Sequence, residues 1–413
     1  MTLTFDEAFF SPEHIRDPVT PLARLLAEGS MHYSEHLGGW VALGYGDARA
    51  ILKHRGIGQG DRLGDYVRNL PREDALRLHP LSQYMDRAIS FLDPPEHAAQ
   101  RAAATQVLDA GLGRRIEPSV DAVVRARLDD LATCPSFDGI DDFALPVTVA
   151  MICSILGIRY QDREEFIAWV ERVFAYLGSP MDDPEMAADC KDAYAQIANY
   201  VGNLFSQARS TADSEPENLI ELLVAPDAPG DRTQPDVMGM VVGMVQGGFE
   251  TTTTLVSNAI AMLLQHPVQL GAIRRDQSLL PSAIEEVLRL APSLKIGARQ
   301  ALVDIDLGNQ RINAGERVIP VILAANRDPA VFAQPDTFDI LRHPNPHLAF
   351  GFGTHFCIGA PLARMQARIA VGALLDRFES LSIAGQLRWR PSGLLRRLES
   401  LPLAHRDPAP RFP

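Results

Sequence analysis

The chain has 413 residues and a formal net charge of −13 at pH 7, from 39 Lys plus Arg against 52 Asp plus Glu. Hydrophobic residues make up 46% and charged residues 22%, as in ordinary globular proteins, which excludes disorder over most of the chain. An acidic chain also lacks the positive surface that binds nucleic acid or anionic membranes, so we expect neither partner, although a local basic patch could dock an acidic protein.

Apolar periodicity predicts that most of the chain is helical. In chain order, helices are expected over residues 94–110, 115–133, 143–157, 161–177, 184–209, 216–224, 235–265, 268–275, 279–290 and 361–378. Strands are expected to be short, over residues 40–43, 298–303, 317–321 and 381–388. Residues 56–90 are irregular, and a loop of that length is usually functional. The length allows two or three domains or one large one, and the continuous pattern favours a single domain over residues 1–413 that is mainly α with a small β region.

Cysteine usage and the N-terminus indicate the compartment. The four cysteines, Cys134, Cys153, Cys190 and Cys357, are few and scattered, and none forms a C-x-x-C pair. They do not suggest a disulfide framework, so we expect a reducing, cytoplasmic location. No signal peptide or membrane anchor is visible at the N-terminus. The weakly charged stretch 237–264 holds Glu250 at its middle, which favours a long core helix over a membrane span.

Residues 350–359, FGFGTHFCIG, place one cysteine among three glycines just ahead of a predicted helix. Glycines permit positive φ and close approach of the backbone to a flat ligand. The N–H groups and dipole of a helix N-terminus stabilise thiolate over thiol, and a thiolate suits a metal. The alternative for Cys357 is a small buried hydrophobe in a turn.

The spacing F-x-x-G-x-H-x-C-x-G is matched in full, and its five fixed positions give a chance match on the order of one in a million per window. The segment resembles the haem-binding loop of the cytochrome P-450 family, the haem-thiolate monooxygenases. That resemblance implies the P-450 fold, haem b as cofactor and Cys357 as the axial iron ligand. It also implies that Phe350 packs against the loop, that His355 faces a haem propionate, and that Gly359 belongs to the cofactor site.

A second match is Glu286-Val287-Leu288-Arg289, in which the acid and the arginine share one helix face. Alone such a pair is usually a solvated surface contact. Its position resembles the E-x-x-R helix of the family, and Arg342 matches the second arginine that joins this pair. The resemblance implies that all three residues are structural rather than catalytic.

A third match lies in the predicted helix 235–265, where Gly247-Gly248 precede Phe249, Glu250 and Thr251. Glycine in a helix costs about 1 kcal/mol against alanine, so two adjacent glycines need a reason. Close helix packing is one reason, and space for a diatomic ligand is the other. The pattern resembles the acid–alcohol pair of the family, which implies a catalytic, proton-delivering role for Glu250 and Thr251, although Phe249 departs from the usual residue.

A fourth match concerns cationic residues. His97 and Arg101 are four apart, so they share a helix face and form an anion clamp. The resemblance implies that they bind a haem propionate, together with Arg299. For a lone histidine on a helix, the alternative is an ordinary surface position.

The resemblance implies a soluble, bacterial-type monooxygenase that inserts one oxygen atom of O₂ into a small organic substrate. No reductase domain is fused, so a separate ferredoxin and ferredoxin reductase are expected, with Arg364 and Arg368 as a possible basic docking patch or an ordinary solvated face. Two alternatives are a peroxide-driven haem-thiolate peroxygenase, which needs no acid–alcohol pair, and a haem gas sensor or carrier.

The substrate itself cannot be identified from the sequence. We expect the pocket to be lined by segments 56–90, 172–190, 293–297 and 393–395 and by one face of the long helix. The candidate substrate residues are Met240, Gly243, Met244, Gly247, Leu294, Lys295 and Leu394.

Lys295 carries a hypothesis about substrate charge. If strand alternation extends back from Arg299, Lys295 shares its face, and its ammonium lies near the pocket, where a substrate carboxylate could pair with it. The alternatives are that Lys295 pairs with a propionate or reaches solvent, or that Leu294 is the pocket residue instead.

Overall fold

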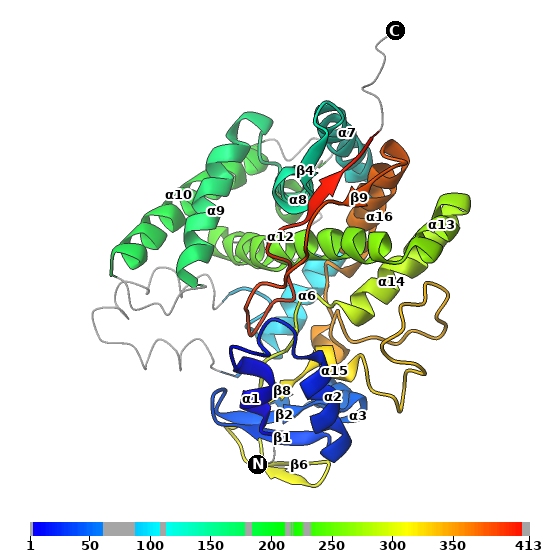
Figure 1. The fold of residues 1–413 in the computed structure, drawn as a ribbon. Helices are drawn as coiled ribbons and strands as arrows, with labels where there is room; N and C mark the ends of the chain where they lie inside the picture. The colour runs from blue at the N-terminus through cyan, green and yellow to red at the C-terminus, as the bar shows by residue number, and fades with distance from the viewer. Residues whose placement is uncertain are drawn as a thin grey trace. The chain divides into compact units, whose positions relative to one another are not determined.

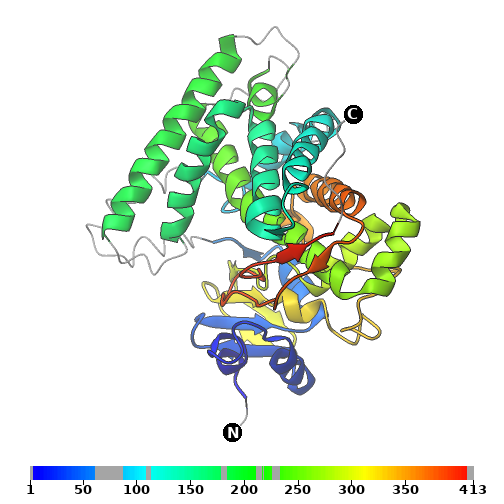
Figure 2. The same ribbon diagram turned by 45° about the horizontal axis from the view of Figure 1, so that its top comes forward.

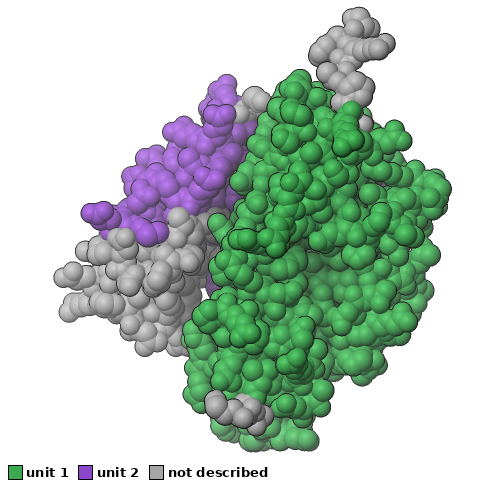
Figure 3. Space-filling view, in the orientation of Figure 1, with its two compact units in different colours: residues 1–58, 121–148, 250–413 green, residues 59–120, 149–249 purple. Residues whose placement is uncertain are grey.

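The computed structural model describes residues 3–60, 87–107, 113–177, 184–210, 216, 218–225 and 233–406. Most of the irregular segment 56–90 and part of segment 172–190 therefore lie outside the described residues. The chain divides into two compact units, which are coloured separately in Figure 3. Unit 1 comprises Met1–Gly58, Asp121–Thr148 and Glu250–Pro413, and unit 2 comprises Gln59–Val120 and Val149–Phe249. The single domain over 1–413 stays a prediction.

Helices dominate both units, which confirms the predicted fold class (Figure 1). Unit 1 holds α1 (Phe5–Phe10), α2 (Val19–Glu28), α3 (Tyr45–Lys53), α13 (Pro267–Arg275), α14 (Leu280–Leu290), α15 (Ile322–Ala325) and α16 (Ala360–Arg377). Unit 2 holds α6 (Glu96–Val107), α9 (Arg163–Leu177), α10 (Pro184–Ser210) and α11 (Leu219–Val224). Three helices run through a boundary between the units: α7 (Gly113–Leu131), α8 (Leu145–Leu156) and α12 (Gln234–Gln265).

The strands form small sheets in unit 1. The largest sheet has the order β1-β2-β8-β5-β3, from Met31–Ser34, Gly39–Ala42, Arg317–Pro320, Arg299–Ala301 and Ile57–Gly58. A second sheet has the order β4-β10-β9, from Ser136–Asp138, Pro402–Ala404 and Ser382–Ile383. A third pairs β6 (Ile305–Leu307) with β7 (Gln310–Ile312). The predicted strand 381–388 is therefore wrong beyond Ile383, where β9 ends, and the chain next pairs at the isolated bridge from Trp389 to Leu398.

The side chains of the main sheet alternate between two faces, and each face packs against helices in its own apolar cluster. Val41 and Ile319 point into a cluster with α1 and α2, where Phe5, Phe9 and Leu25 are buried. Figure 2 shows these two dark-blue helices along one face of the sheet. On the other face, residues such as Ala42 and Val318 pack with α3 in a separate apolar cluster. Arg299 is the first residue of β5, so this sheet holds its backbone in place.

Among the residues that the structure describes, one segment is long and apolar enough to cross a bilayer. It is Gly139–Leu156, and 72% of it is buried inside the structure. A core helix of a folded protein meets the same criterion, and burial on this scale favours that interpretation.

Candidate functional site

Cys357 lies between the short 3₁₀ turn Gly353–His355 and the first turn of α16. Its backbone N–H donates to the carbonyl of Phe350 over 2.8 Å, and its own carbonyl accepts from Ala360 N–H over 3.3 Å. Its side chain is exposed, whereas Cys153 and Cys190 are buried and burial raises the pKa of each to about 11. Among the four cysteines, all of them described and none in a disulfide, Cys357 is the one at a helix N-terminus inside a closed loop.

Two glycines of this loop are required by geometry. Gly353 has φ +72°, and a Cβ built there would lie 2.7 Å from the carbonyl oxygen of Leu52. Gly351 has φ +71°. An L side chain would be strained at both positions. A Cβ on Gly359 would lie 3.9 Å from the Cys357 sulfur, so Gly359 borders the thiol at ordinary van der Waals distance.

Phe350 packs against the loop as expected. Its ring centroid is 6.4 Å from that of Phe356, and the guanidinium of Arg364 lies over it at 4.5 Å. Arg364 in turn donates to both carboxylate oxygens of Glu285, each over 2.7 Å, and His347 lies 3.1 Å from Glu285. Burial opposes the charge on Glu285, but these hydrogen bonds outweigh it and lower its pKa to about 2. Arg364 is therefore tied to an internal carboxylate, which weakens the idea that it offers its charge to a docking partner.

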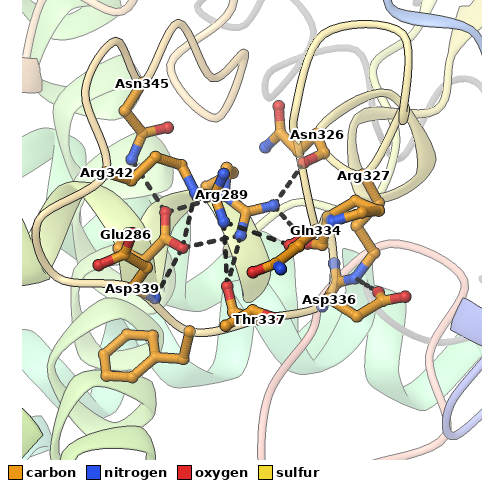
Figure 4. A network of polar contacts seen from close by, with 12 residues as sticks. Glu286, Arg289, Asn326, Arg327, Gln334, Asp336, Thr337, Asp339, Arg342 and Asn345 are labelled. Carbon is orange, nitrogen blue, oxygen red and sulfur yellow. Dashed lines mark hydrogen bonds and ion pairs between the residues drawn. The ribbon is translucent and has the colours of Figure 1, made fainter.

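Glu286, Arg289 and Arg342 form a buried network, which confirms the expected trio (Figure 4). Arg289 donates to both oxygens of Glu286 over 2.8 Å, and Arg342 Nε donates to Oε1 over 3.0 Å. Asp339 N–H and the Asn345 amide also donate to this carboxylate. The remaining donors of the two arginines reach carbonyls in segment 326–337, for example those of Asn326, Pro335 and Thr337. The network joins α14 to the segment that leads into the cysteine loop.

Glu250 and Thr251 lie on α12, on the unit 1 side of its boundary. Glu250 Oε1 is 3.3 Å from Nη1 of Arg397, a residue that sequence reasoning missed. The Thr251 carbonyl accepts a hydrogen bond of 2.7 Å from the Ser293 hydroxyl. The acid–alcohol pair is therefore held by groups outside its own helix.

The glycines of α12 in unit 2 have different surroundings. A Cβ on Gly239 would lie 2.8 Å from the Arg87 carbonyl oxygen, so close packing explains that glycine. A Cβ built on Gly243 would lie 3.7 Å from the Ala88 Cβ. A Cβ built on Gly247 would have no described neighbour within 4 Å, the backbone of its own helix apart. Close packing therefore explains Gly239, whereas the role of Gly247 beside a ligand stays a prediction. Met240 and Met244 lie on the same face of the helix, and Met240 is buried.

The four proposed propionate contacts lie at the following places. His97 is buried in the first turn of α6, and Arg101 is half-buried one turn further along the same helix in unit 2. Arg299 is half-buried at the start of β5, where its guanidinium donates to the Ala298 carbonyl, and His355 is half-buried in the turn before Cys357. These roles stay predictions.

Lys295 does not point where the sequence argument placed it. Its ammonium donates to the Ile15 carbonyl over 3.0 Å and lies 5.3 Å from the Phe9 ring centroid, toward the N-terminal segment. The argument failed because β5 begins only at Arg299, so strand alternation does not extend back to residue 295. Nor does Lys295 reach solvent, because it is buried. Its neighbour Leu294 bridges to Leu395, beside Leu394, which is 52% exposed.

We expect a pH-dependent contribution to stability from Lys295. Burial, with the nearby Arg396 charge, lowers the pKa of Lys295 from 10.5 to about 8, although Asp17 opposes this. Between pH 8 and 10.5 the unfolded chain holds a proton here that the folded protein has lost, so the free energy of unfolding rises with pH. Relative to Lys295→Met, the wild type should gain about 3 kcal/mol across that window. Urea unfolding of both proteins at several pH values measures this, and parallel curves would contradict it.

Comparison with known proteins identifies the family. Residues 64–391 match the family model described as "Cytochrome P450". The chain belongs to the cytochrome P450 family. It is 34% identical to cytochrome P450 monooxygenase PikC of Streptomyces venezuelae, over 94% of this chain and 91% of that protein.

Solved structures are also similar in fold. CalO2 superimposes with a TM-score of 0.87 at 30% identity and covers 99% of this chain and 100% of its own. The myxobacterial CYP267B1 in complex with myristic acid superimposes with a TM-score of 0.84 at 31% identity, over 98% and 100% of the two chains. P450 proteins are oxidoreductases that bind haem b through a cysteine thiolate and act on small molecules with O₂.

The residues present fit that cofactor. Cys357 offers a soft, exposed sulfur at a helix N-terminus, which is the kind of group that binds haem iron as a thiolate. The loop glycines adopt the positive φ angles that let the backbone turn beside a flat ring. No cluster of three His, Cys, Asp or Glu side chains suited to another metal occurs in the part of the chain that the structure describes.

Proposed function

We propose that Cys357 is the thiolate ligand of haem b in this P450. We further propose that the enzyme converts a C–H bond of a small organic substrate to C–OH, with one atom of O₂ entering the product and the other leaving as water. The two electrons are supplied by NADH through a ferredoxin reductase and a ferredoxin, both separate proteins, and two protons come from solvent. The geometry of Cys357 carries this proposal: an exposed sulfur ahead of α16, in a loop closed by its N–H bond to Phe350.

Haem, when bound, supplies the O₂-activating chemistry, and the chain supplies ligation, binding and proton delivery. His97, Arg101, Arg299 and His355 would hold the propionates, since buried carboxylates need cationic or hydrogen-bonding partners. Glu250 and Thr251 would carry protons from solvent into the active site. In support, the Glu250 side chain is 29% exposed, so it is accessible to water while lying on the core helix α12.

The proposal also covers the substrate pocket, the docking site of the electron donor and the compartment. The wall residues would be Met240, Gly243, Met244 and Gly247 of α12 together with Leu294 and Leu394. Lys295 is withdrawn from this set, because its ammonium is bonded to Ile15. Arg368, exposed on α16, remains a candidate for ferredoxin docking in the cytoplasm. The spectral change of haem from low to high spin, measured over a compound library, would identify substrates.

Turnover assays separate this function from its two alternatives. The monooxygenase should form product with O₂, NADH and a surrogate ferredoxin system. A peroxygenase would form product with hydrogen peroxide and gain nothing from the ferredoxin, and a gas sensor would form product in neither assay. Product that depends on the ferredoxin system therefore supports the proposal, and either other pattern contradicts it.

Thr251→Ala tests proton delivery. We expect the variant to keep haem and substrate binding but to divert reducing equivalents into hydrogen peroxide, because a positioned proton-transfer group contributes about 10²–10⁴-fold. The measurement is product and peroxide formed per NADH consumed. Thr252→Ala, one residue further along α12 and buried, is the matched control and should remain coupled. Equal coupling in Thr251→Ala and wild type would remove Thr251 from the mechanism.

A further inference from the structure

The acid of the acid–alcohol pair is held by an arginine from the far end of the chain. Glu250 and Arg397 are 147 residues apart in sequence, and their side chains meet at 3.3 Å. The Arg397 side chain is only 16% exposed, and that of Glu250 is 29% exposed. An exposed pair of this kind would contribute little, but a guanidinium withdrawn this far from water needs its partner.

Arg397 reaches Glu250 because the backbone on either side of it is fixed. It lies on a hairpin in which Trp389 bridges Leu398 and Arg390 N–H donates to the Arg397 carbonyl. Asn258, two turns beyond Glu250 on α12, donates its side-chain amide to the Arg396 carbonyl over 2.9 Å. The helix that carries the acid thus also holds the hairpin that carries the arginine.

The same hydrogen-bond network includes Thr251, the alcohol of the pair. Ser293 donates its hydroxyl to the Thr251 carbonyl over 2.7 Å, and its own carbonyl accepts from Arg396 N–H over 3.0 Å. Ser293 therefore connects the backbone beside Arg397 to the backbone of Thr251. Displacing the hairpin would shift the arginine relative to both members of the pair.

We propose that Arg397 is a positioning residue that holds the Glu250 carboxylate in the orientation from which it passes protons to Thr251. This inference rests on the proposed roles of Glu250 and Thr251. A glutamate side chain has three rotatable bonds, and a proton relay requires its oxygens within hydrogen-bond reach of both solvent and acceptor. The ion pair with Arg397 removes that freedom while leaving the carboxylate partly exposed to water.

Arg397→Met tests the inference in the haem-loaded enzyme. We expect substrate spin shift to be unchanged, the share of NADH recovered in product to fall by about tenfold with matching peroxide, and the solvent isotope effect on turnover to rise. Arg397→Lys should restore most of the coupling, because an ammonium can still bind the carboxylate. Arg390→Met, which removes an exposed guanidinium from the paired position of the same hairpin, is the matched control and should behave as wild type.

Double variants with Glu250→Gln distinguish positioning from general damage. If Arg397 acts through Glu250, Arg397→Met adds no further uncoupling to Glu250→Gln, and the two changes shift the urea-unfolding midpoint non-additively. Should Arg397→Met fold poorly, Arg397→Gln replaces it throughout. Two results would overturn the role of Arg397 but leave the proton-delivery proposal standing. One is full coupling in Arg397→Met while Thr251→Ala is uncoupled, and the other is additive effects of Arg397→Met and Glu250→Gln. Full coupling in both Arg397→Met and Thr251→Ala overturns the proton-delivery proposal as well.

Discussion

We expect Cys357→Ser to abolish the red-shifted Soret band that a thiolate ligand gives to the reduced carbon-monoxide complex. Cys357 is exposed, precedes the N-terminus of α16 and lies in a loop that its N–H bond to Phe350 keeps closed. Serine occupies nearly the same volume, so the loop should keep its shape while losing the sulfur. An alkoxide forms far less readily than a thiolate at neutral pH, so the electron donation that shifts the band is lost.

The matched control is Cys134→Ser. Cys134 is the other exposed cysteine of the chain, and it lies after α7, away from the glycine-rich loop in sequence. We expect it to keep both the band and the haem content of the wild type. A red-shifted band that survives in Cys357→Ser, or that is lost in Cys134→Ser, would contradict the assignment of the ligand.

The elements that sequence predicted best are long helices with clear boundary signals, since Pro235 and Pro361 lie in their first turns and Pro267 follows the first of them. The helix expected over 235–265 is α12, Gln234–Gln265, and that expected over 361–378 is α16, Ala360–Arg377. The N-terminal helices α1, α2 and α3 were missed. Each is ten residues or fewer, so its apolar face is only two or three side chains, and its stability comes from packing on the sheet.

Local motifs predicted short-range contacts well. They did not predict the direction of side chains whose partners are distant in sequence. The contact between Glu286 and Arg289 was predictable because residues three apart share a helix face. The positive φ angles in the cysteine loop were predictable because glycine favours them. Lys295 was misplaced because the boundary of β5 depends on pairing with β8, which one sequence does not reveal. No local pattern predicted the role of Arg397, because its partner Glu250 lies 147 residues earlier in the chain.

Glu286→Gln should have the second large effect, a loss of about 3–5 kcal/mol in the free energy of unfolding. Gln keeps the volume of Glu286 but carries no charge, so Arg289, fully buried, and Arg342, mostly buried, would be left as two cations without a counter-charge. Gln can also accept fewer of the hydrogen bonds that the carboxylate now takes from Arg289, Arg342, Asp339 and Asn345. Such a loss is a large part of the stability of a typical domain.

The position of the network makes haem loading a second measurement. It fastens segment 326–345 to α14, directly before the cysteine loop, so its loosening should lower haem content as well as the urea-unfolding midpoint. Arg159→Met is the matched control, because Arg159 and Asp162 pair over 2.7 Å at the same three-residue spacing while Arg159 is exposed to solvent. Water can replace that partner, so the midpoint should not move. If Glu286→Gln lowers the midpoint no more than Arg159→Met does, the buried trio is not what holds this segment in place.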